Sequence, residues 1–296
     1  MTDWITAFHN PLHIRRVASN SLVIGMARIN AGWRQKFLLR SDAHHDSPKC
    51  DRKTETSDLD QAIEENAGIL DFGDLYDAMQ GKGDPRGNLD DLLPQYKTGK
   101  YLDALVDVAA QDYKPYARQW LVLADGNHET SVRAKKEVDL TERTVAAFRR
   151  EPDCYTEKGA YAGWITFQFE MRKTVRQSLR LYYCHGTGGN GTSTFGVGQI
   201  RTQASYLNDA DFIVNGHNHN AYHVPLVALG CNAQGKPYDK VIHSLRTPGY
   251  KRGFRHDTTG GFEIEKGHAP QPVGCCWLEF VYNGANIETR ITVNAK

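Results

Sequence analysis

Side chains that commonly bind metal ions follow five short apolar segments of the sequence, at the point where each segment ends. The segments are KFLLRS, ILDF, WLVLA, LRLYYC and DFIV, and the side chains are those of Asp42, His44, Asp74, Asp77, Asn127, His128, His185, His217 and His219. Because the ends of several strands converge at one edge of an α/β sheet, we expect these side chains to form a single cluster. Oxygen and imidazole ligands without thiolate favour Zn, Mn or Fe in a hydrolytic site over a structural zinc finger.

The spacing within two of these motifs suits a pair of metal ions. Asp42 and His44 are two residues apart, as are His217 and His219. In an extended segment the side chains of residues i and i+2 point to the same side, and their Cα atoms are about 6 to 7 Å apart. Two such histidines can each reach one of two ions held about 3.5 to 4 Å apart, and a carboxylate such as Asp74 can bridge the ions. Glycines at positions 73, 126 and 216 would let the backbone turn sharply beside the ions.

The ordered series D-x-H, G-D-x-x-D, G-N-H-E, a single His and G-H-x-H resembles the motifs of the calcineurin-like metallophosphoesterase superfamily. It extends over residues 42–219, about 60% of the chain. One such motif alone would be weak evidence for a metal site, because an Asp after a strand is usually a turn residue and a lone His is usually structural. The resemblance implies an α/β fold of two facing mixed β-sheets flanked by helices, a four-layer αββα sandwich.

The resemblance also implies a role for each side chain. The ligands of one metal ion would be Asp42, His44, Asp74 and His219. The second ion would be bound by the bridging Asp74 together with Asn127, His185 and His217. His128 is similar to the family's catalytic histidine, which faces the phosphate without binding metal, and Asp77 matches the carboxylate that orients it. Two divalent ions are implied, Mn first and Zn, Fe or Ni as alternatives, and they would activate a water for attack on phosphorus. His128 would donate a proton to the leaving oxygen or stabilise the developing charge.

The departures from the family pattern bear on the substrate. Protein Ser/Thr phosphatases typically carry arginines after the second motif and before G-N-H, where this chain has Ala78 and Asp125. If Asp125 faces the site, it would repel a doubly charged phosphomonoester more than a singly charged diester. We therefore expect a binuclear metal-dependent phosphodiesterase acting on nucleic acid or nucleotides. The alternatives are a nucleotide phosphomonoesterase or pyrophosphohydrolase, and a non-catalytic metal-binding interaction module on the same fold.

Composition limits the setting of this activity. Lys and Arg total 36 against 35 Asp and Glu, so any surface for nucleic acid must be local, and DNA, RNA and nucleotides all stay open as partners. No apolar run approaches the roughly 18 to 20 residues of a membrane helix, and residues 1–16 do not resemble a secretory signal. Six cysteines without a CxxC pair indicate free thiols and a cytoplasmic location. The segments DSPKCDR and DAMQGKGDPRG are similar to those of phage-encoded metallophosphoesterases, which implies a host cytoplasm.

The elements that must position these residues alternate between strands and helices, as in one layered domain over residues 1–296. Strands are predicted at 36–41, 69–72, 120–124, 164–170, 179–184, 211–214, 223–229, 240–245, 275–282 and 287–293, with a hairpin turn at 172–177. Helices are predicted at 57–68, 101–113, 136–150 and 197–208, the first with Ser57 or Asp58 as N-cap and Gly68 as C-cap. Excursions are expected near 79–100 and 247–274. The second contains Lys251, Arg252 and Arg255, which either face an anionic substrate or lie on a solvated loop.

Overall fold

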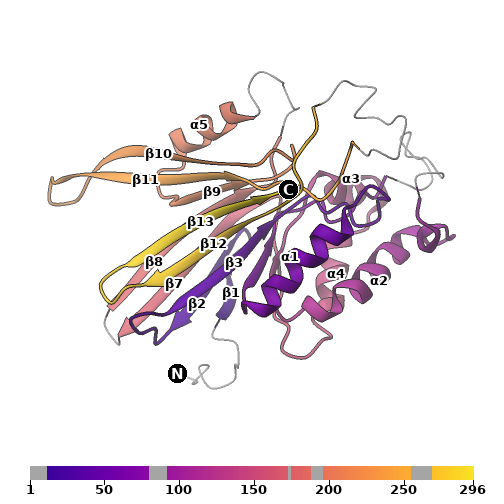
Figure 1. Cartoon of the computed structure of the whole chain (residues 1–296), viewed down its shortest axis with the longest axis horizontal. Coiled ribbons are helices and arrows are strands. Elements are labelled where there is room, and N and C mark those ends of the chain that lie inside the picture. Colours follow the sequence, from indigo (N-terminus) through magenta and orange to yellow (C-terminus); the bar gives the residue numbers. More distant parts are fainter. Residues whose placement is uncertain (1–11, 80–91, 173–174, 188–195, 255–268) are drawn as a thin grey trace.

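Two mixed β-sheets face each other in the computed structural model, which describes residues 12–79, 92–172, 175–187, 196–254 and 269–296 (Figure 1). Within these ranges the larger sheet has the order β1 (Leu12–Ala18), β2 (Ser21–Ala27), β7 (Ala162–Arg172), β8 (Val175–Cys184), β9 (Phe212–Asn215), β11 (Pro237–Arg246) and β10 (Tyr222–Cys231). The smaller sheet has the order β13 (Ile287–Ala295), β12 (Gly274–Tyr282), β3 (Arg34–Arg40), β4 (Gly68–Asp71), β5 (Trp120–Leu123) and β6 (Glu157–Lys158).

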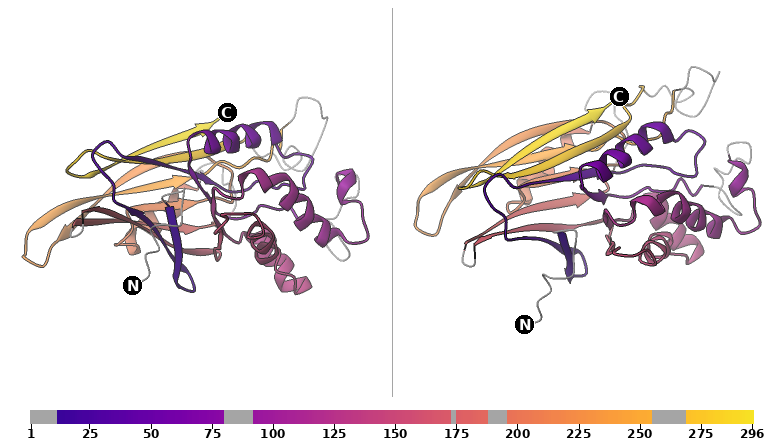
Figure 2. Two further views of the ribbon diagram at one scale, coloured as in Figure 1. Left: turned by 90° about the horizontal axis from the view of Figure 1, so that it is seen from below. Right: turned by 60° about the horizontal axis from the view of Figure 1, so that its bottom comes forward.

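Helices cover both outer faces of this sheet pair. The helices α1 (Arg52–Glu64), α2 (Tyr101–Tyr113) and α4 (Leu140–Phe148) pack on the smaller sheet, while α5 (Val197–Tyr206) packs on the larger one (Figure 2). The other helices of the described residues are α3 (Asn127–Lys136) and the short 3-10 turns η2 (Pro94–Tyr96) and η3 (Lys114–Tyr116). The predicted α/β fold of two mixed sheets flanked by helices is therefore confirmed.

An aromatic core holds the two sheets together. The ring of Phe37 on β3 lies 4.9 Å from that of Phe167 on β7, and the ring of Phe280 on β12 lies 4.9 Å from Phe167. All three side chains are fully buried. Phe37 and Phe280 alternate along their strands with residues that face the outer helices, such as Leu38 and Trp277, so β3 and β12 each contribute to both layers of the core.

Parallel pairing aligns the strand ends that matter for the site. In the smaller sheet Arg40, Asp71 and Leu123, which end β3, β4 and β5, are direct neighbours in register. In the larger sheet Cys184 and Asn215 end β8 and β9 in the same way. The segments that leave these strands therefore emerge at one edge of the sandwich.

Two helix boundaries differ from the sequence prediction. The first helix begins at Arg52 rather than Ser57 or Asp58, because Asp51 is the N-cap and accepts a hydrogen bond from the Thr54 N–H at 3.1 Å. It ends at Glu64, and Gly68 is the first residue of β4 rather than a C-cap.

The predicted helix over 136–150 is instead the end of α3 followed by α4. Glu137 adopts a left-handed conformation (φ 57°) that terminates α3. Asp139 then caps α4 by accepting from the Glu142 N–H at 2.9 Å.

Other predictions are confirmed, missed or outside the described residues. The hairpin of β7 and β8 is present, with Ala162 opposite Cys184, although residues 173–174 of its turn lie outside the described ranges. Strands β1, β2 and β6 were not predicted. The excursions near 79–100 and 247–274 fall partly on residues 80–91 and 255–268, which are likewise not described. Among the described helices, none combines the length and apolar character required to span a membrane.

Candidate metal centre

The five strand ends bring all the predicted site residues to one edge of the sandwich. Asp42 and His44 follow β3, and Asp74 and Asp77 follow β4. Asn127 and His128 are the first residues of α3, directly after β5. From the larger sheet, His185 follows β8, and the pair His217 and His219 follows β9. The site is thus built from both sheets.

Asp42, His44 and His219 form one group of potential metal ligands. The Nε2 atoms of His44 and His219 lie 3.3 Å apart, and His219 Nε2 lies 3.4 Å from Asp42 Oδ1. The ligand atoms of the three side chains all lie within 4.8 Å of one another. Three donors therefore converge on one point.

A second group lies beside the first and consists of Asp74, Asn127, His185 and His217. His185 Nε2 lies 3.0 Å from Asp74 Oδ2 and 3.1 Å from Asn127 Oδ1. Asn127 Oδ1 also lies 2.7 Å from His217 Nδ1. The two groups are in contact, because His185 Nε2 is 3.9 Å from Asp42 Oδ1 and Asp74 also groups with His44 and His128.

The donor atoms fit a divalent ion in both groups. Ligands at about 2.0 to 2.1 Å from a tetrahedral Zn are about 3.3 Å apart, close to the separations seen here. In each aspartate one carboxylate oxygen accepts a hydrogen bond from a backbone N–H. Asp42 Oδ2 accepts from the His217 N–H and Asp74 Oδ1 from the His128 N–H, both at 2.9 Å. Asp42 Oδ1 is buried without a hydrogen-bond partner among the described residues, as expected of an atom that binds a metal ion.

The charge of the site favours a cation. Burial opposes charge on His185, but Asp74 and Asp42 outweigh it and raise the pKa of its imidazole to about 10. Burial likewise opposes ionisation of Asp42, yet His219 and His185 hold the pKa of its carboxyl below the ordinary value. Burial, together with Lys251, lowers the pKa of His44 to about 4, so this imidazole is neutral and able to bind metal near pH 7.

The backbone that carries the ligands is not extended, contrary to the sequence-based argument for the i and i+2 pairs. Five of the predicted ligands have left-handed φ values, namely Asp42 (54°), His44 (47°), Asp74 (54°), His217 (72°) and His219 (56°). This conformation is rare for residues other than glycine and is found mostly where function requires it. Successive tight turns, rather than strand alternation, aim these side chains at the cluster.

All three of the glycines before the motifs are required by space. A Cβ atom on Gly73, which has a φ of 104°, would overlap the backbone of Asp125 and Gly126. A Cβ atom on Gly126 would overlap Asp74, both its backbone N and its Oδ1. A Cβ atom on Gly216 would overlap Ser41 Oγ. The close approach of backbone to ligand that was expected here is therefore present.

His128 contacts Asp77, but not through the carboxylate that the resemblance implies. The Nδ1 atom of His128 donates to the backbone carbonyl of Asp77. The Asp77 carboxylate instead lies 2.9 Å from His44 Nδ1. Because a carbonyl only accepts, His128 carries its proton on Nδ1 and presents Nε2 to the cluster, 3.7 Å from Asp74 Oδ2.

Asp125 points away from the cluster, so the repulsion considered for it is absent. Its carboxylate accepts from Arg133 Nη1 and from the Thr141 hydroxyl, both at 2.7 Å. The side chain is buried between α3 and α4.

Sequence reasoning assigned no role to Glu129. Glu129 is buried and accepts backbone N–H bonds from Asp74 (3.1 Å), Tyr76 (3.0 Å) and Gly126 (2.8 Å), so it joins the second and third motifs. The signal for it was present, since a Glu three residues after a helix N-cap is typical of a capping box. Lys251, which the sequence placed either facing an anionic substrate or on a solvated loop, lies beside the cluster, with its Nζ 2.7 Å from Asp77 Oδ1.

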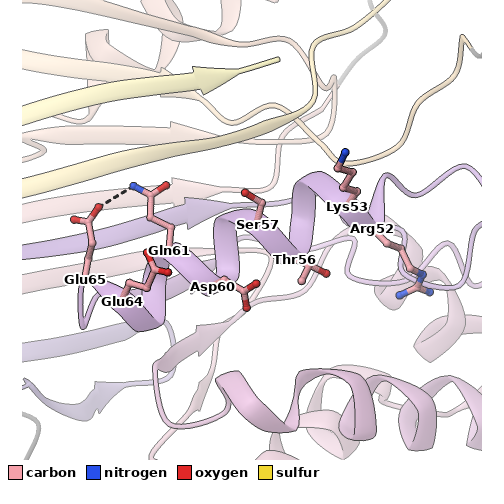
Figure 3. Close-up of a pocket in the computed structure, with 8 residues that line it drawn as sticks. All are labelled: Arg52, Lys53, Thr56, Ser57, Asp60, Gln61, Glu64 and Glu65. Atoms are coloured by element: carbon pink, nitrogen blue, oxygen red, sulfur yellow. Dashed lines mark hydrogen bonds between the residues drawn. The ribbon is translucent and has the colours of Figure 1, made fainter.

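A separate surface hollow runs along α1 and does not compete as a site. Figure 3 shows that its lining comes from α1 and the residue after it, with Arg52 and Lys53 near one end and Glu64 and Glu65 near the other. The side chain of Gln61 donates to Glu65 Oε1 at 2.8 Å. Charges of both signs spread along one exposed helix face form no convergent ligand set.

Comparisons with known proteins show distant similarity only. No protein-family model matches the chain, and no curated protein matches it significantly. A Streptococcus pneumoniae protein described as a predicted phosphoesterase is 11% identical with a TM-score of 0.32, over 89% of this chain and 91% of that one. GAP50, described as the anchor in the inner membrane complex of Plasmodium, is 11% identical with a TM-score of 0.41, over 88% and 84%. A Thermotoga maritima protein is 12% identical with a TM-score of 0.29, over 88% and 99%. Similarities this weak do not define the activity, which has to be inferred from the site.

Proposed function

We propose that this protein is a binuclear metal-dependent phosphoester hydrolase. The observation that carries the proposal is the pair of adjoining ligand groups with His128 beside them. The first ion would be held by Asp42, His44, Asp74 and His219, and the second by Asp74, Asn127, His185 and His217. Two divalent ions held side by side supply Lewis acidity and an activated water, which is the chemistry that phosphoester hydrolysis requires.

His128 would provide the acid of this reaction. Its Nδ1 is fixed by the Asp77 carbonyl, and its ring centroid lies 5.0 Å from that of His44, so Nε2 stands at the wall of the cluster. A protonated Nε2 at this position can donate to the oxygen of the leaving group. Asp77 positions this imidazole through its backbone.

We favour a phosphodiester of nucleic acid or nucleotides as the substrate class. Neither Ala78 nor Asp125 brings a cation to the cluster, and the charge of Lys251 is balanced by Asp77. A singly charged diester needs less compensation than a doubly charged monoester. A nucleotide phosphomonoesterase or pyrophosphohydrolase is the second candidate, because Asp125 does not face the cluster and would not repel a dianion.

Hydrolysis of bis-p-nitrophenyl phosphate, beside p-nitrophenyl phosphate, tests this proposal. Metal-free protein is assayed with and without added Mn, and His128→Ala is the matched variant because it leaves every proposed metal ligand in place. We expect Mn-dependent turnover of the diester that falls by about 10²- to 10⁴-fold in the variant, since a positioned acid contributes about that much.

Each other outcome has a definite meaning. Turnover of the monoester alone would favour the phosphomonoesterase over the phosphodiesterase as the activity of this protein. Metal binding without turnover of either compound, or of DNA, RNA and nucleotide substrates tried next, would favour the non-catalytic metal-binding module. Mn as the physiological metal, the nucleic-acid partner, the phage origin and the cytoplasmic location stay predictions from the sequence.

A further inference from the structure

Lys251 reaches the metal centre from a segment distant in sequence. The backbone around it packs on the segment after β3: Tyr250 N–H donates to the Asp42 carbonyl at 2.9 Å, and Lys251 forms a β-bridge with Cys50. The side chain is only 14% exposed, and its Nζ lies 2.7 Å from Asp77 Oδ1. A lysine held this way is part of the site's wall rather than a solvated surface residue.

The same carboxylate oxygen of Asp77 contacts His44. Asp77 Oδ1 lies 2.9 Å from His44 Nδ1, and the Asp77 side chain is 12% exposed. The backbone N–H of Asp77 donates to Asp46 Oδ1 at 2.6 Å, which holds this residue in place. Because a carboxylate only accepts, this contact favours the tautomer of His44 with its proton on Nδ1, which leaves the lone pair of Nε2 facing His219 and the first ligand group.

We propose that Lys251 and Asp77 form a positioning pair that holds His44 as an Nε2 ligand and thereby sets the affinity of the first metal ion. The inference rests on the metal centre of the proposed function, and not on which phosphoester is cleaved. The Lys251 ammonium compensates the charge of a carboxylate that is largely removed from water. It also restricts the rotation of that carboxylate, so that Oδ1 stays against His44.

A direct contact of Lys251 with the substrate is the competing role, and metal affinity separates the two. A positioning residue acts before substrate arrives and therefore changes metal binding by the substrate-free protein. A substrate contact changes KM and leaves metal binding as it was.

Calorimetric titration of the metal-free full chain with Mn tests the pair. In wild type we expect two ions to bind. Lys251→Met and Asp77→Asn should each weaken one of them by about 10- to 100-fold, the usual effect of losing a residue that orients a metal ligand, and leave the other unchanged. The double variant should be no weaker than the single ones, because both act through the same contact.

Arg252→Met is the matched control for Lys251→Met. It removes a positive charge from the next residue, but Arg252 contacts Asp51 at the start of α1 rather than the cluster. Its metal affinities should equal those of wild type. Circular dichroism of the metal-free variants checks that each is folded. If Lys251→Met is not, Lys251→Gln takes its place with the same expected result.

Unchanged metal affinity in a folded Lys251 variant would overturn the pairing, and a raised KM in that variant would assign Lys251 to the substrate. Additive losses in the double variant would overturn it as well. A wild-type chain that binds Mn but cleaves no phosphoester would contradict the proposed function while leaving this test intact. A wild-type chain that binds no metal would overturn both.

Discussion

Contacts to the backbone orient three of the proposed ligand side chains, those of His185, Asp42 and Asp74. His185 Nδ1 donates to the Phe72 carbonyl at 2.9 Å, which leaves Nε2 for the cluster. Asp42 and Asp74 each accept one backbone N–H with one oxygen and present the other to the cluster. Because the backbone supplies these contacts, its path at the glycines decides whether the ligands converge.

Gly126→Ala should therefore damage both stability and metal binding. The added Cβ would overlap the backbone N and Oδ1 of Asp74, neither of which can move without displacing the cluster. We expect a loss of about 1 to 3 kcal/mol in the free energy of unfolding, as for overpacked interiors, and weaker binding of Mn. Denaturant unfolding of the metal-free protein and calorimetric titration measure the two effects.

Gly99→Ala is the matched control, since a Cβ atom there has no atom within 4 Å. It should leave metal affinity unchanged. Equal behaviour of the two alanine variants would show that the close approach at Gly126 is not required.

At the scale of elements, a buried arginine joins the helices to the strands that carry the site. Arg40, the last residue of β3, is fully buried and pairs with Glu55 of α1 at 2.7 Å and with Asp71 of β4 at 2.9 Å. Asp71 in turn accepts from the Gly73 N–H at 3.1 Å, directly before Asp74. The strand ends are thus held in register by charge as well as by the sheet.

Arg40→Met should destabilise the protein strongly, because it keeps the volume of the side chain and leaves two carboxylates buried without their cation. Removing one partner of a buried ion pair typically costs about 3 to 5 kcal/mol. Arg34→Met on the same strand is the control: its pair with Glu279 is 4.0 Å long and Arg34 is 62% exposed, so a change of at most about 1 kcal/mol is expected. Urea unfolding compares them, and a loss for Arg40→Met no larger than for Arg34→Met would contradict this account.

Features that the local sequence determines were predicted well, and features that depend on other parts of the chain were not. Strands such as β4 and β5 are buried on both faces, so they read as short apolar runs and their ends could be located. The helix α3 was missed because only Glu129 and Val132 on it are buried, which leaves no apolar periodicity. The first helix was started too late because Asp51, Ser57 and Asp58 are all residues that favour N-caps.

The contacts that complete the site were beyond sequence reasoning. Lys251 and Asp77 are 174 residues apart, and no local pattern relates them. The carboxylate of Asp77 contacts His44 rather than His128, and His44 has a left-handed φ of 47°. Residues other than glycine rarely adopt this conformation, so the sequence does not predict it.

At the scale of the whole molecule, the candidate metal centre lies where the two sheets meet. Its first group takes Asp42 and His44 from the smaller sheet and His219 from the larger one, and its second group is likewise divided. The aromatic core between the sheets sets their separation, and with it the distance between the ligands that the two sheets contribute to one ion. Two ions bound here would therefore join the sheets as well as perform chemistry.

The number of divalent ions bound per chain, counted by native mass spectrometry after reconstitution with Mn, tests the central claim most directly. We predict two ions for wild type. His219→Ala, which removes a ligand of the first group, and His185→Ala, which removes one of the second, should each retain one. A wild-type chain that binds no ion, or the retention of two ions in both variants, would contradict the assignment of these residues to a binuclear centre.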